Sequence, residues 1–230
     1  MKAIILAAGR GSRMGNLTHE KPKCLLEIYG KPLIEHQIEA LTKGGIEEIA
    51  LVTGYKSELL QSYGNHHFHN DEWDKTNMVY SLLCAKEWLS MSDCIVSYAD
   101  IYYTFEVIKD LVSCPDDIAI SYDPNWLELW SKRFKNPLDD AETFKINQDG
   151  YLLEIGQKPK TVEEIQGQYM GLLKFNSSFF SKVQKNEFTK KISMTDFLST
   201  IIKNKVSIKC IKNNTIWNEF DSASDLQVNV

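Results

Sequence analysis

The amino-acid sequence predicts a single α/β domain with helices on both faces of a mainly parallel sheet. In the first half, short apolar runs alternate with segments of helical periodicity, which favours parallel strands joined by helices. In the second half, two β-type runs meet at Asp149-Gly150, a signal for a β-hairpin. The 230 residues, 43% of them hydrophobic, can bury one large core, and no low-complexity linker divides them. We therefore expect one domain over residues 1–230, with the hairpin as a cap on it.

The chain begins with a strand, a glycine-rich loop, a helix and a second strand. Residues 3–8 (AIILAA) form an apolar run that stops at Gly9, as expected of a buried parallel strand. The helix is indicated by apolar residues at helical spacing, namely Leu33, Ile34, Ile38 and Leu41. Gly44 and Gly45 end this helix, and residues 47–54 form the next strand.

The remaining elements follow by the same reasoning. Further helices are expected at residues 56–62, 77–89, 105–112 and 194–203. Further strands are expected at residues 64–69, 94–98, 117–122, 167–175 and 206–211, with the hairpin within 141–156. Ser193 or Thr195 is the expected N-cap of the last helix.

Composition and charge exclude several classes of function. A formal net charge of −5 leaves no general excess of Lys and Arg for nucleic acid, so any anion site must be local. The N-terminal stretch MKAIILAAG is too short to span a membrane and lacks a signal-cleavage pattern, which predicts a cytoplasmic protein without a membrane partner. The odd number and wide spacing of the cysteines predict reduced, mostly buried thiols at Cys24, Cys84, Cys94, Cys114 and Cys210.

The glycine-rich loop after the first strand is the strongest functional signal. Gly9, Gly11 and Gly15 have the spacing G-x-G-x-x-x-G, one residue longer than the dinucleotide fingerprint, and the G-K-[ST] ending of a P-loop is missing. The glycines still allow backbone N–H groups to approach a polyphosphate closely. Four cations could neutralise such a ligand: Arg10, Arg13, Lys21 and Lys23. The competing interpretation is a mobile surface loop with solvated charges.

A resemblance to a known family favours the phosphate site. The stretch LAAGRGSRMGNLTHEKPKCLLEIYGKPLIEHQIEAL resembles the signature of the nucleotidyltransferases that make nucleotide-activated sugars and alcohols, and it matches at Leu6 to Arg13, Pro22-Lys23 and Gly30 to Ile34. YAD at 98–100 and EFD at 219–221 extend the resemblance over most of the chain, while Asn16 stands where a proline is common. The resemblance implies a Rossmann-like mixed sheet and a loop that holds the triphosphate, with nucleotide contacts from Leu6, Ala8, Gly9, Gly11 and Ser12.

Two aspartates are candidates for a magnesium site. Asp100 directly follows the apolar strand 94–98, at the carboxyl edge of the sheet, where open α/β folds bind ligands. An aspartate in this position is more often a turn residue or a helix cap, but the resemblance implies that Asp100 and Asp221 bind Mg²⁺. Mg²⁺ needs only one or two carboxylates when phosphates and waters complete its shell. The resemblance also implies that Arg13 holds the β- and γ-phosphates and that Lys23 bridges the α-phosphate and the acceptor, which makes these four the expected catalytic residues.

The implied reaction is attack by a phosphate or phosphonate oxygen on the α-phosphorus of a nucleoside triphosphate, with pyrophosphate as the leaving group. The second pKa of such an acceptor is about 6, so its oxygen is already largely ionised near neutral pH. No general base is therefore required, and catalysis rests on positioning and charge neutralisation.

Segment 70–89 bears on the choice of nucleotide. It resembles a stretch of the bacterial choline-phosphate and aminoethylphosphonate cytidylyltransferases, in which the start of this helix lies against the pyrimidine. Tyr80 and Ser81 are therefore the candidates for contact with the base. An apolar stripe on the same segment instead indicates an ordinary core-facing helix, and both interpretations can hold on opposite faces.

Segment 122–145 and one later strand supply the candidate acceptor contacts. Aromatic rings beside carboxylates suit an ammonium group through cation–π contacts and ion pairs, and here these are Trp126, Trp130, Asp139, Asp140 and Glu142. Lys132 and Arg133 could pair with a carboxylate, so an acceptor that carries both an ammonium and a carboxylate group stays open. The competing interpretation is that this segment is only a solvated flap. By resemblance, Tyr169 and Gly171 lie on a strand that borders the acceptor. A metal role for His66, His67 and His69 is not favoured, because no acidic or cysteine partner stands nearby in the sequence.

These observations predict a Mg²⁺-dependent cytidylyltransferase whose partners are CTP and a small phosphorylated acceptor. Phosphocholine, 2-aminoethylphosphonate and a phosphorylated amino acid or its amide, such as phosphoglutamine, are the acceptors that we consider. Family context implies a role in decorating a surface polysaccharide, and the oligomeric state, monomer or homodimer, stays open. A sugar-1-phosphate nucleotidyltransferase that uses UTP or dTTP is the first alternative, which the short chain and segment 70–89 disfavour. A non-catalytic nucleotide-binding regulatory module is the second, and the full set of expected catalytic residues argues against it.

Overall fold

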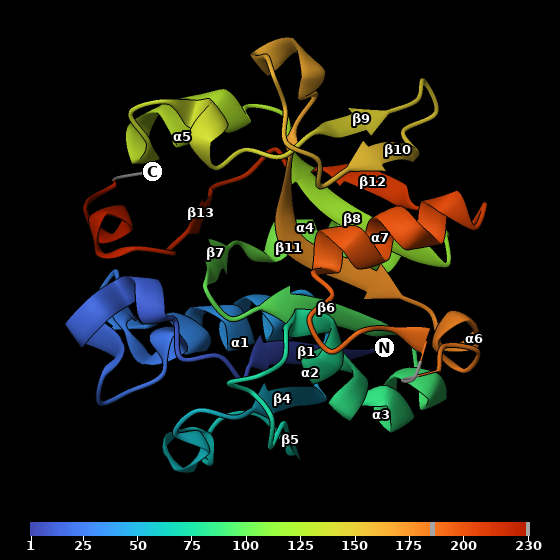
Figure 1. Ribbon diagram of the computed structural model, residues 1–230. Coiled ribbons are helices and arrows are strands. Elements are labelled where there is room, and N and C mark those ends of the chain that lie inside the picture. Colours follow the sequence, from blue (N-terminus) through green and yellow to red (C-terminus); the bar gives the residue numbers. More distant parts are fainter. Residues whose placement is uncertain (185–186, 229–230) are drawn as a thin grey trace.

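A seven-stranded sheet forms the centre of the computed structural model, which describes residues 1–184 and 187–228 (Figure 1). The strand order is β12-β8-β11-β6-β1-β4-β5, and every strand of the sheet except β11 runs in the same direction. The strands are β1 (Lys2–Ala7), β4 (Ile49–Thr53), β5 (His66–His69), β6 (Cys94–Tyr98), β8 (Ile118–Asp123), β11 (Gln168–Phe175) and β12 (Lys209–Lys212). This arrangement confirms the predicted mixed, mainly parallel sheet.

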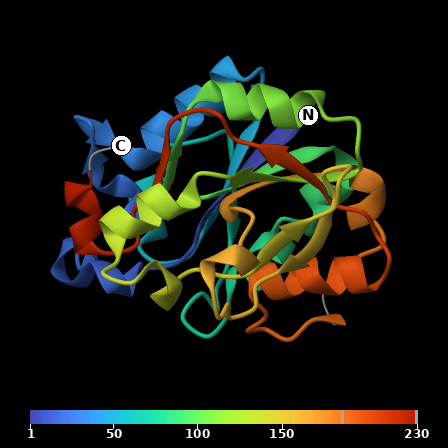
Figure 2. The same cartoon turned by 90° about the horizontal axis from the view of Figure 1, so that it is seen from above.

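Helices cover both faces of the sheet, as Figure 2 shows from above. On one face lie α1 (Leu33–Lys43) and α4 (Phe105–Ser113). On the other face lie α2 (Met78–Cys84), α3 (Lys86–Met91), α6 (Ser177–Phe180) and α7 (Met194–Lys203). Successive side chains of β1 alternate between these layers, with Ile5 packed on the α1 side and Ile4 on the α2 side. The continuous apolar run in β1 reflects this burial from both sides.

Local capping and turn signals are in place where the sequence indicates them. Ser193 accepts a hydrogen bond from the backbone N–H of Asp196 and caps α7, and Asn77 caps α2. In the hairpin of β9 (Phe144–Ile146) and β10 (Leu152–Ile155), Gly150 adopts a left-handed φ of 77° at the turn. The hairpin is fastened to the β12 side, because the Leu152 N–H donates to the carbonyl of Ile208 over 2.9 Å.

Two expected helices differ from the prediction. The single helix expected at 77–89 is divided at Ala85, whose φ of −98° and ψ of 19° end α2 and begin α3. Buried residues on both sides of this break keep helical spacing, so periodicity could not reveal it. The helix expected at 56–62 is only the short 3₁₀ helix Ser57–Leu60, which follows a left-handed Lys56.

The sequence does not predict helix α6, helix α5 or two pairs of short strands. Helix α5 (Trp126–Arg133) occupies part of the segment interpreted as a charged loop or flap. The strands β7 (Ile101–Tyr103) and β13 (Trp217–Glu219) form an antiparallel pair outside the main sheet. A further pair joins β2 (Glu27–Ile28) and β3 (Lys31–Pro32). Strands of two or three residues are too short for periodicity to indicate them.

The cysteines and the helix lengths bear on two other expectations. All five cysteines are thiols outside any disulfide, and every one except the half-buried Cys84 is buried, which confirms the prediction for these residues. Within the described ranges, no helix has both the length and the apolar character needed to cross a bilayer. The short 3₁₀ helices are Ser12–Thr18, Lys23–Leu25, Ser57–Leu60, Pro137–Asp139, Val162–Glu164 and Ala223–Gln227.

Candidate active site

The loop after β1 leads directly into a charged cluster at the carboxyl ends of the parallel strands. Gly11 adopts a left-handed φ of 72°, and the hydroxyl of Thr18 donates to its carbonyl over 3.0 Å. A Cβ atom on Gly11 would lie 2.9 Å from the Cβ of Lys23, which is too close for ordinary contact. Gly11 therefore allows the loop to pass tightly over the side chain of Lys23.

Lys23 is the centre of this cluster. Its Nζ donates to Asp100 Oδ2 over 2.7 Å and to Asp221 Oδ1 over 2.8 Å. Arg13 adds a second cation, with Nη1 3.0 Å from Asp221 Oδ2. Burial lowers the pKa of Lys23, but the two carboxylates more than offset this and raise its pKa above the ordinary value. The structure thus brings together all four residues that the sequence predicts as catalytic, with Lys23 held in the charged form.

The short pair β7/β13 explains why two distant aspartates meet. Asp100 precedes β7 and Asp221 follows β13, and Glu219 pairs with Ile101 in the antiparallel register. Beyond this pair, the backbone N–H of Phe220 donates to the carbonyl of Asp100 over 2.9 Å. The strand pair therefore sets the separation of the two carboxylates.

Two adjoining cavities open on either side of this cluster. The loop cavity has a volume of about 180 Å³ and is lined by Leu6, Ala7, Gly9, Gly11, Arg13, Lys23, Cys24, Met78, Tyr98, Ala99 and Asp100. The carboxylate cavity has a volume of about 260 Å³ and is lined by Arg13, Asn77, Met78, Tyr98, Trp130, Asp140, Glu142, Gln168, Tyr169, Gly171, Ser193, Met194, Thr195, Glu219 and Asp221. Arg13, Met78 and Tyr98 line both. The arrangement can hold two ligands that meet at the ion-pair cluster.

The carboxylate cavity has a strongly acidic lining. Asp140, Glu142, Glu219 and Asp221 face it, and Arg13 is the one cation among the described residues that line it. Burial raises the pKa values of Asp140 and Glu142. Burial and then the adjacent Asp221 raise the pKa of Glu219 to about 7. Such a cavity favours a cationic ligand, which would relieve the repulsion between these carboxylates.

Tyr98 forms the wall between the two cavities because Gly171 leaves space for its ring. A Cβ atom on Gly171 would lie 2.8 Å from the Tyr98 ring, and Gly171 also adopts a left-handed φ of 78°. The ring of Tyr169 meets Tyr98 edge to face, with 5.8 Å between centroids. These aromatic faces border the acidic lining, an arrangement that suits an ammonium group.

Residues 3–150 match the model of the MobA-like NTP transferase domain, and this span is more than half of the chain. The chain belongs to this family. The sequence of this NTP transferase is 41% identical to the CTP:phosphoglutamine cytidylyltransferase of Campylobacter jejuni, over 100% of this chain and 99% of that protein. It is 45% identical to the choline-phosphate cytidylyltransferase of Streptococcus pneumoniae over 96 residues, which are 40% of this chain and 42% of that one. The predicted resemblance is thereby confirmed.

Solved structures confirm the fold of this NTP transferase. The inositol-1-phosphate CTP transferase of T. maritima superimposes with a TM-score of 0.80 at 18% identity, covering 97% of this chain and 90% of that one. The CTP:phosphocholine cytidylyltransferase of Streptococcus pneumoniae gives a TM-score of 0.72 at 24% identity, covering 98% and 96%. The two enzymes share the architecture of this chain.

The carboxylates of this NTP transferase fit a magnesium ion that substrate phosphates would help to bind. Asp100 Oδ1 is buried and has no hydrogen-bond partner among the described residues, so one carboxylate oxygen beside Asp221 is available to a cation. Over the same part of the chain, no group of three or more His, Cys, Asp or Glu side chains is arranged to hold a metal, the histidines of β5 included. Mg²⁺ tolerates this scarcity of protein ligands because it retains waters and binds phosphate oxygens.

Some expected site residues of this NTP transferase lie away from the cavities. Trp126 is buried and donates to the carbonyl of Ile165 over 3.3 Å. The Arg133 side chain has no exposed surface and pairs with Glu219 and Asp225, so it is not presented to an acceptor carboxylate. Ala8 and Ser12 flank the loop cavity without lining it. The charged and aromatic residues of segment 122–145 indicate a ligand site. Helix α5, which the sequence does not predict, instead directs Trp126 and Arg133 into the interior.

The two candidate base contacts also line neither cavity. Ser81 is buried and its hydroxyl accepts from Asn70 Nδ2 over 2.9 Å. Tyr80 donates to Glu72 over 2.6 Å, and Lys190 pairs with the same carboxylate. Met78 from the same helix reaches both cavities instead. Sequence reasoning did not single out Met78 or Tyr98, although YAD at 98–100 contains the second.

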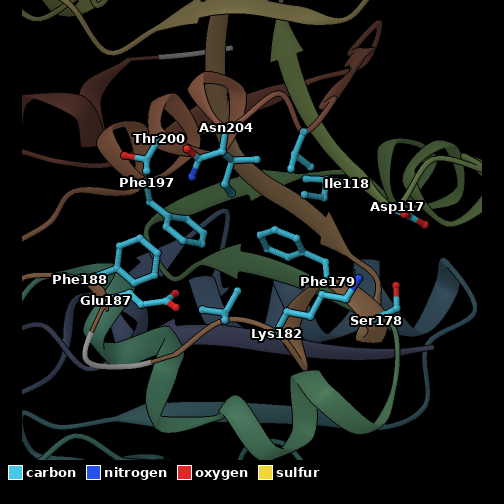
Figure 3. Close-up of a pocket in the computed structure, with 13 residues that line it drawn as sticks. Asp117, Ile118, Ser178, Phe179, Lys182, Glu187, Phe188, Phe197, Thr200 and Asn204 are labelled. Atoms are coloured by element: carbon cyan, nitrogen blue, oxygen red, sulfur yellow. The ribbon is translucent and has the colours of Figure 1, made fainter.

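A larger cavity of about 400 Å³ lies elsewhere, between α6, α7 and the start of β8 (Figure 3). Phe179, Phe188 and Phe197 point into it. Its lining is mainly apolar and includes none of the expected site residues. Its size therefore does not make it the active site, because the groups suited to phosphate chemistry lie at the opposite ends of the strands.

Proposed function

We propose that this NTP transferase is a cytidylyltransferase that transfers CMP from CTP to a phosphate or phosphonate oxygen of a small cationic acceptor. The observation that carries the proposal is the meeting of Lys23, Asp100 and Asp221 between two adjoining cavities. Full-length similarity to a protein named CTP:phosphoglutamine cytidylyltransferase supports CTP as the donor. The loop cavity would receive CTP and the carboxylate cavity the acceptor.

Positioning and charge neutralisation account for the chemical step. The acceptor oxygen forms a bond to the α-phosphorus, the bond from that phosphorus to the bridging oxygen breaks, and pyrophosphate leaves with the electron pair. The glycine loop and Arg13 would bind the β- and γ-phosphates, whose charge increases as they leave. Lys23 would bind the α-phosphate and the incoming oxygen together, since charge develops between them in the transition state. Bound at Asp100 and Asp221, Mg²⁺ would supply Lewis acidity and offset phosphate charge.

The acceptor that we propose carries an ammonium group. The acidic lining of the carboxylate cavity and the rings of Trp130, Tyr98 and Tyr169 support this chemistry. Phosphoglutamine, phosphocholine and 2-aminoethylphosphonate all contain such a group, and the 41% identical relative favours phosphoglutamine or a related phosphorylated amide. Arg133 is buried in ion pairs with Glu219 and Asp225, and Lys132 does not line the carboxylate cavity, so recognition would rest on the ammonium end of the acceptor.

We also propose that the CMP-activated product serves the decoration of a cell-surface polysaccharide. This part rests on family context alone. It is tested by deleting the gene in the source cell and analysing the surface polymer for loss of a phosphate- or phosphonate-linked amine. An unchanged polymer would contradict the assignment without affecting the transfer reaction.

A pyrophosphate-release assay tests the reaction. The purified protein is incubated with Mg²⁺, one of CTP, UTP or dTTP, and one of phosphoglutamine, phosphocholine, 2-aminoethylphosphonate or glucose 1-phosphate. We expect release with CTP and an aminated acceptor. Release with UTP or dTTP and the sugar phosphate, but not with CTP, would identify a sugar-1-phosphate nucleotidyltransferase. Nucleotide binding without release in any combination would instead indicate a regulatory binding module.

A further inference from the structure

The backbone of Asp221 is held by a buried carboxylate that no step of the proposed reaction uses. Asp225 is 2% exposed and lies in the 3₁₀ helix Ala223–Gln227. Its Oδ2 accepts from the backbone N–H of Asp221 over 2.9 Å and from the N–H of Ser222 over 2.7 Å. The hydroxyl of Ser222 donates to the same oxygen over 3.0 Å. One oxygen of Asp225 thus accepts from three donors on two consecutive residues, Asp221 and Ser222.

Helix capping explains only part of this arrangement. Ser222 is the N-cap and Asp225 the N3 residue of a capping box, which requires the bonds between these two residues. The N–H of Asp221 lies before the N-cap, outside the helix, so the box does not need it. This additional bond acts on the residue whose carboxylate contacts Lys23 and Arg13. The bond between the Asp221 N–H and Asp225 therefore affects the candidate active site rather than the helix.

The other oxygen of Asp225 is anchored from a distant part of the fold. Arg133 at the end of α5 donates from Nε to Asp225 Oδ1 over 3.0 Å, and from Nη1 to Glu219 over 2.6 Å. The guanidinium carbon of Arg133 also lies 5.0 Å from the ring centre of Trp130, a lining residue of the carboxylate cavity. The segment that carries Asp221 is thus tied to the helix that lines the acceptor side.

We propose that Asp225 is a positioning residue that holds the backbone of Asp221, so that the Asp221 carboxylate faces Lys23 and the metal. The inference rests on the proposed function, since it assigns Asp221 a role in binding Mg²⁺. The Phe220 N–H is held by the Asp100 carbonyl and the Asp221 N–H by Asp225, so hydrogen bonds anchor consecutive peptide groups. Groups that orient a metal ligand in this way usually affect affinity about 10- to 100-fold.

The substitution Asp225→Asn keeps the shape of the side chain but changes the hydrogen bonds that it can form. An asparagine has one acceptor oxygen and one donor group in the place of two acceptors. If its oxygen faces the N–H groups of Asp221 and Ser222, its NH₂ group faces the Nε–H of Arg133, which is also a donor. The side chain fits the space but cannot serve both partners. Ser222→Ala is the matched control, because it removes one capping bond from the same turn and leaves the Asp221–Asp225 bond in place.

Mn²⁺ binding in the presence of CTP, followed by the electron paramagnetic resonance signal of free Mn²⁺, tests the proposal without turnover. We expect Asp225→Asn to weaken Mn²⁺ binding about tenfold or more, and Ser222→Ala to leave it unchanged. In kinetics, Asp225→Asn should raise the Mg²⁺ concentration for half-maximal rate more than it lowers the rate at saturating Mg²⁺. Thermal melting of both variants measures the structural cost independently.

Several results would overturn the proposal. Equal effects of Asp225→Asn and Ser222→Ala on Mn²⁺ binding would reduce Asp225 to a capping residue. Wild-type affinity in Asp225→Asn, or no Mn²⁺ binding by the wild type with CTP, would also overturn it. If Asp225→Asn does not fold, Asp225→Glu retains the charge for Arg133 and moves the oxygen away from Asp221, and it should weaken Mn²⁺ binding in the same direction. A third outcome combines weaker Mn²⁺ binding in the variants with no pyrophosphate release by the wild type. It would uphold the positioning role and contradict only the proposed transfer reaction.

Discussion

Lys23 and Asp221 are separated by 198 residues in the sequence, yet their Nζ and Oδ1 atoms lie 2.8 Å apart. This ion pair joins the loop after the first strand to the segment after β13. Lys23 also pairs with Asp100, so one lysine compensates two carboxylates while Arg13 assists at Asp221. In the proposed reaction, Lys23 exchanges these carboxylates for the α-phosphate. The ion pairs therefore keep the site charge-balanced before the substrates bind.

Replacement of Lys23 by alanine should abolish turnover and also destabilise the protein. The substitution leaves Asp100 and Asp221 without their shared cation at a site where each side chain is less than one-fifth exposed. Removal of one partner from such a pair costs about 3 kcal/mol. Urea unfolding with and without MgCl₂ measures the loss, which Mg²⁺ should partly restore. Lys56→Ala, at an exposed pair with Glu20, is the control and should change little.

Asp221→Asn should abolish pyrophosphate release while leaving the fold intact. The amide retains the shape of the side chain but loses the charge that pairs with Lys23 and Arg13. The rate at saturating substrates and the circular dichroism spectrum are the two measurements. Asp149→Asn, at the exposed hairpin turn, should have the wild-type rate. A normal rate in Asp221→Asn would remove this carboxylate from the mechanism.

Gly11→Ala should impair catalysis more than Gly15→Ala, although both glycines have left-handed φ angles. At Gly11, in the left-handed helical region (φ 72°, ψ 51°), an alanine strains the backbone by about 1 kcal/mol. Gly15 (φ 60°, ψ −126°) lies in a region almost restricted to glycine, so an alanine there is strained more. A Cβ at Gly11 also meets the side chain of Lys23 at 2.9 Å, whereas a Cβ at Gly15 meets nothing within 4 Å. Thermal melting measures the strain, and a lower rate in Gly11→Ala than in Gly15→Ala, despite the greater backbone strain at Gly15, would attribute the effect to displaced Lys23. Equal rates in the two variants would contradict this explanation.

Glu142→Gln should raise the KM for an aminated acceptor without changing the KM for CTP. Glu142 lines the carboxylate cavity but not the loop cavity. Loss of a hydrogen bond to a charged group costs about 1.5–3 kcal/mol, which corresponds to about a 10- to 150-fold weaker interaction. An acceptor with a hydroxyl group in place of the ammonium should show the same defect with the wild-type enzyme. A matching rise in the KM for CTP would place Glu142 in a different role.

Stability should fall as the pH rises above about 9. Burial raises the pKa values of Cys94 and Cys210 to about 12, from the ordinary value of 9.0. Between these values the unfolded chain releases thiol protons that the folded chain keeps, so ionisation favours unfolding, by up to about 1.4 kcal/mol per pH unit for each thiol. Urea unfolding from pH 7.5 to 10.5 measures the slope, and Cys210→Ala should reduce it. A slope unaffected by this variant would exclude Cys210 as a contributor.

The sequence predicts most of the main sheet because its strands and helices carry local signals. The apolar run of β1, the cap at Ser193 and the turn at Gly150 depend on neighbouring residues and are found as expected. The antiparallel direction of β11 between β6 and β8 leaves no trace in side-chain periodicity, so only the family resemblance implied a mixed sheet.

For the site, the sequence identifies the reacting groups better than their surroundings. The signature motifs name Lys23 and Asp100, which the structure brings together. The pairing of β7 with β13 and the burial of Arg133 depend on partners about 90 residues or more away, and no local pattern encodes them. A charged residue in a polar segment is normally expected at the surface. The sequence therefore suggests that Arg133 contacts a ligand, whereas in the structure it pairs with Glu219 and Asp225.

The place of Asp221 in the chain orders events during synthesis. The ribosome releases the glycine loop first, then β6 and Asp100, and last of these the β13 segment, which is followed by Asp221. Protein domains are made from the N-terminus onward, so a nascent chain exposes Lys23 long before Asp221 exists to meet it. A chain stalled before residue 217 holds the phosphate loop but not the complete cluster. In the proposed reaction, such a chain would lack one of the four catalytic residues.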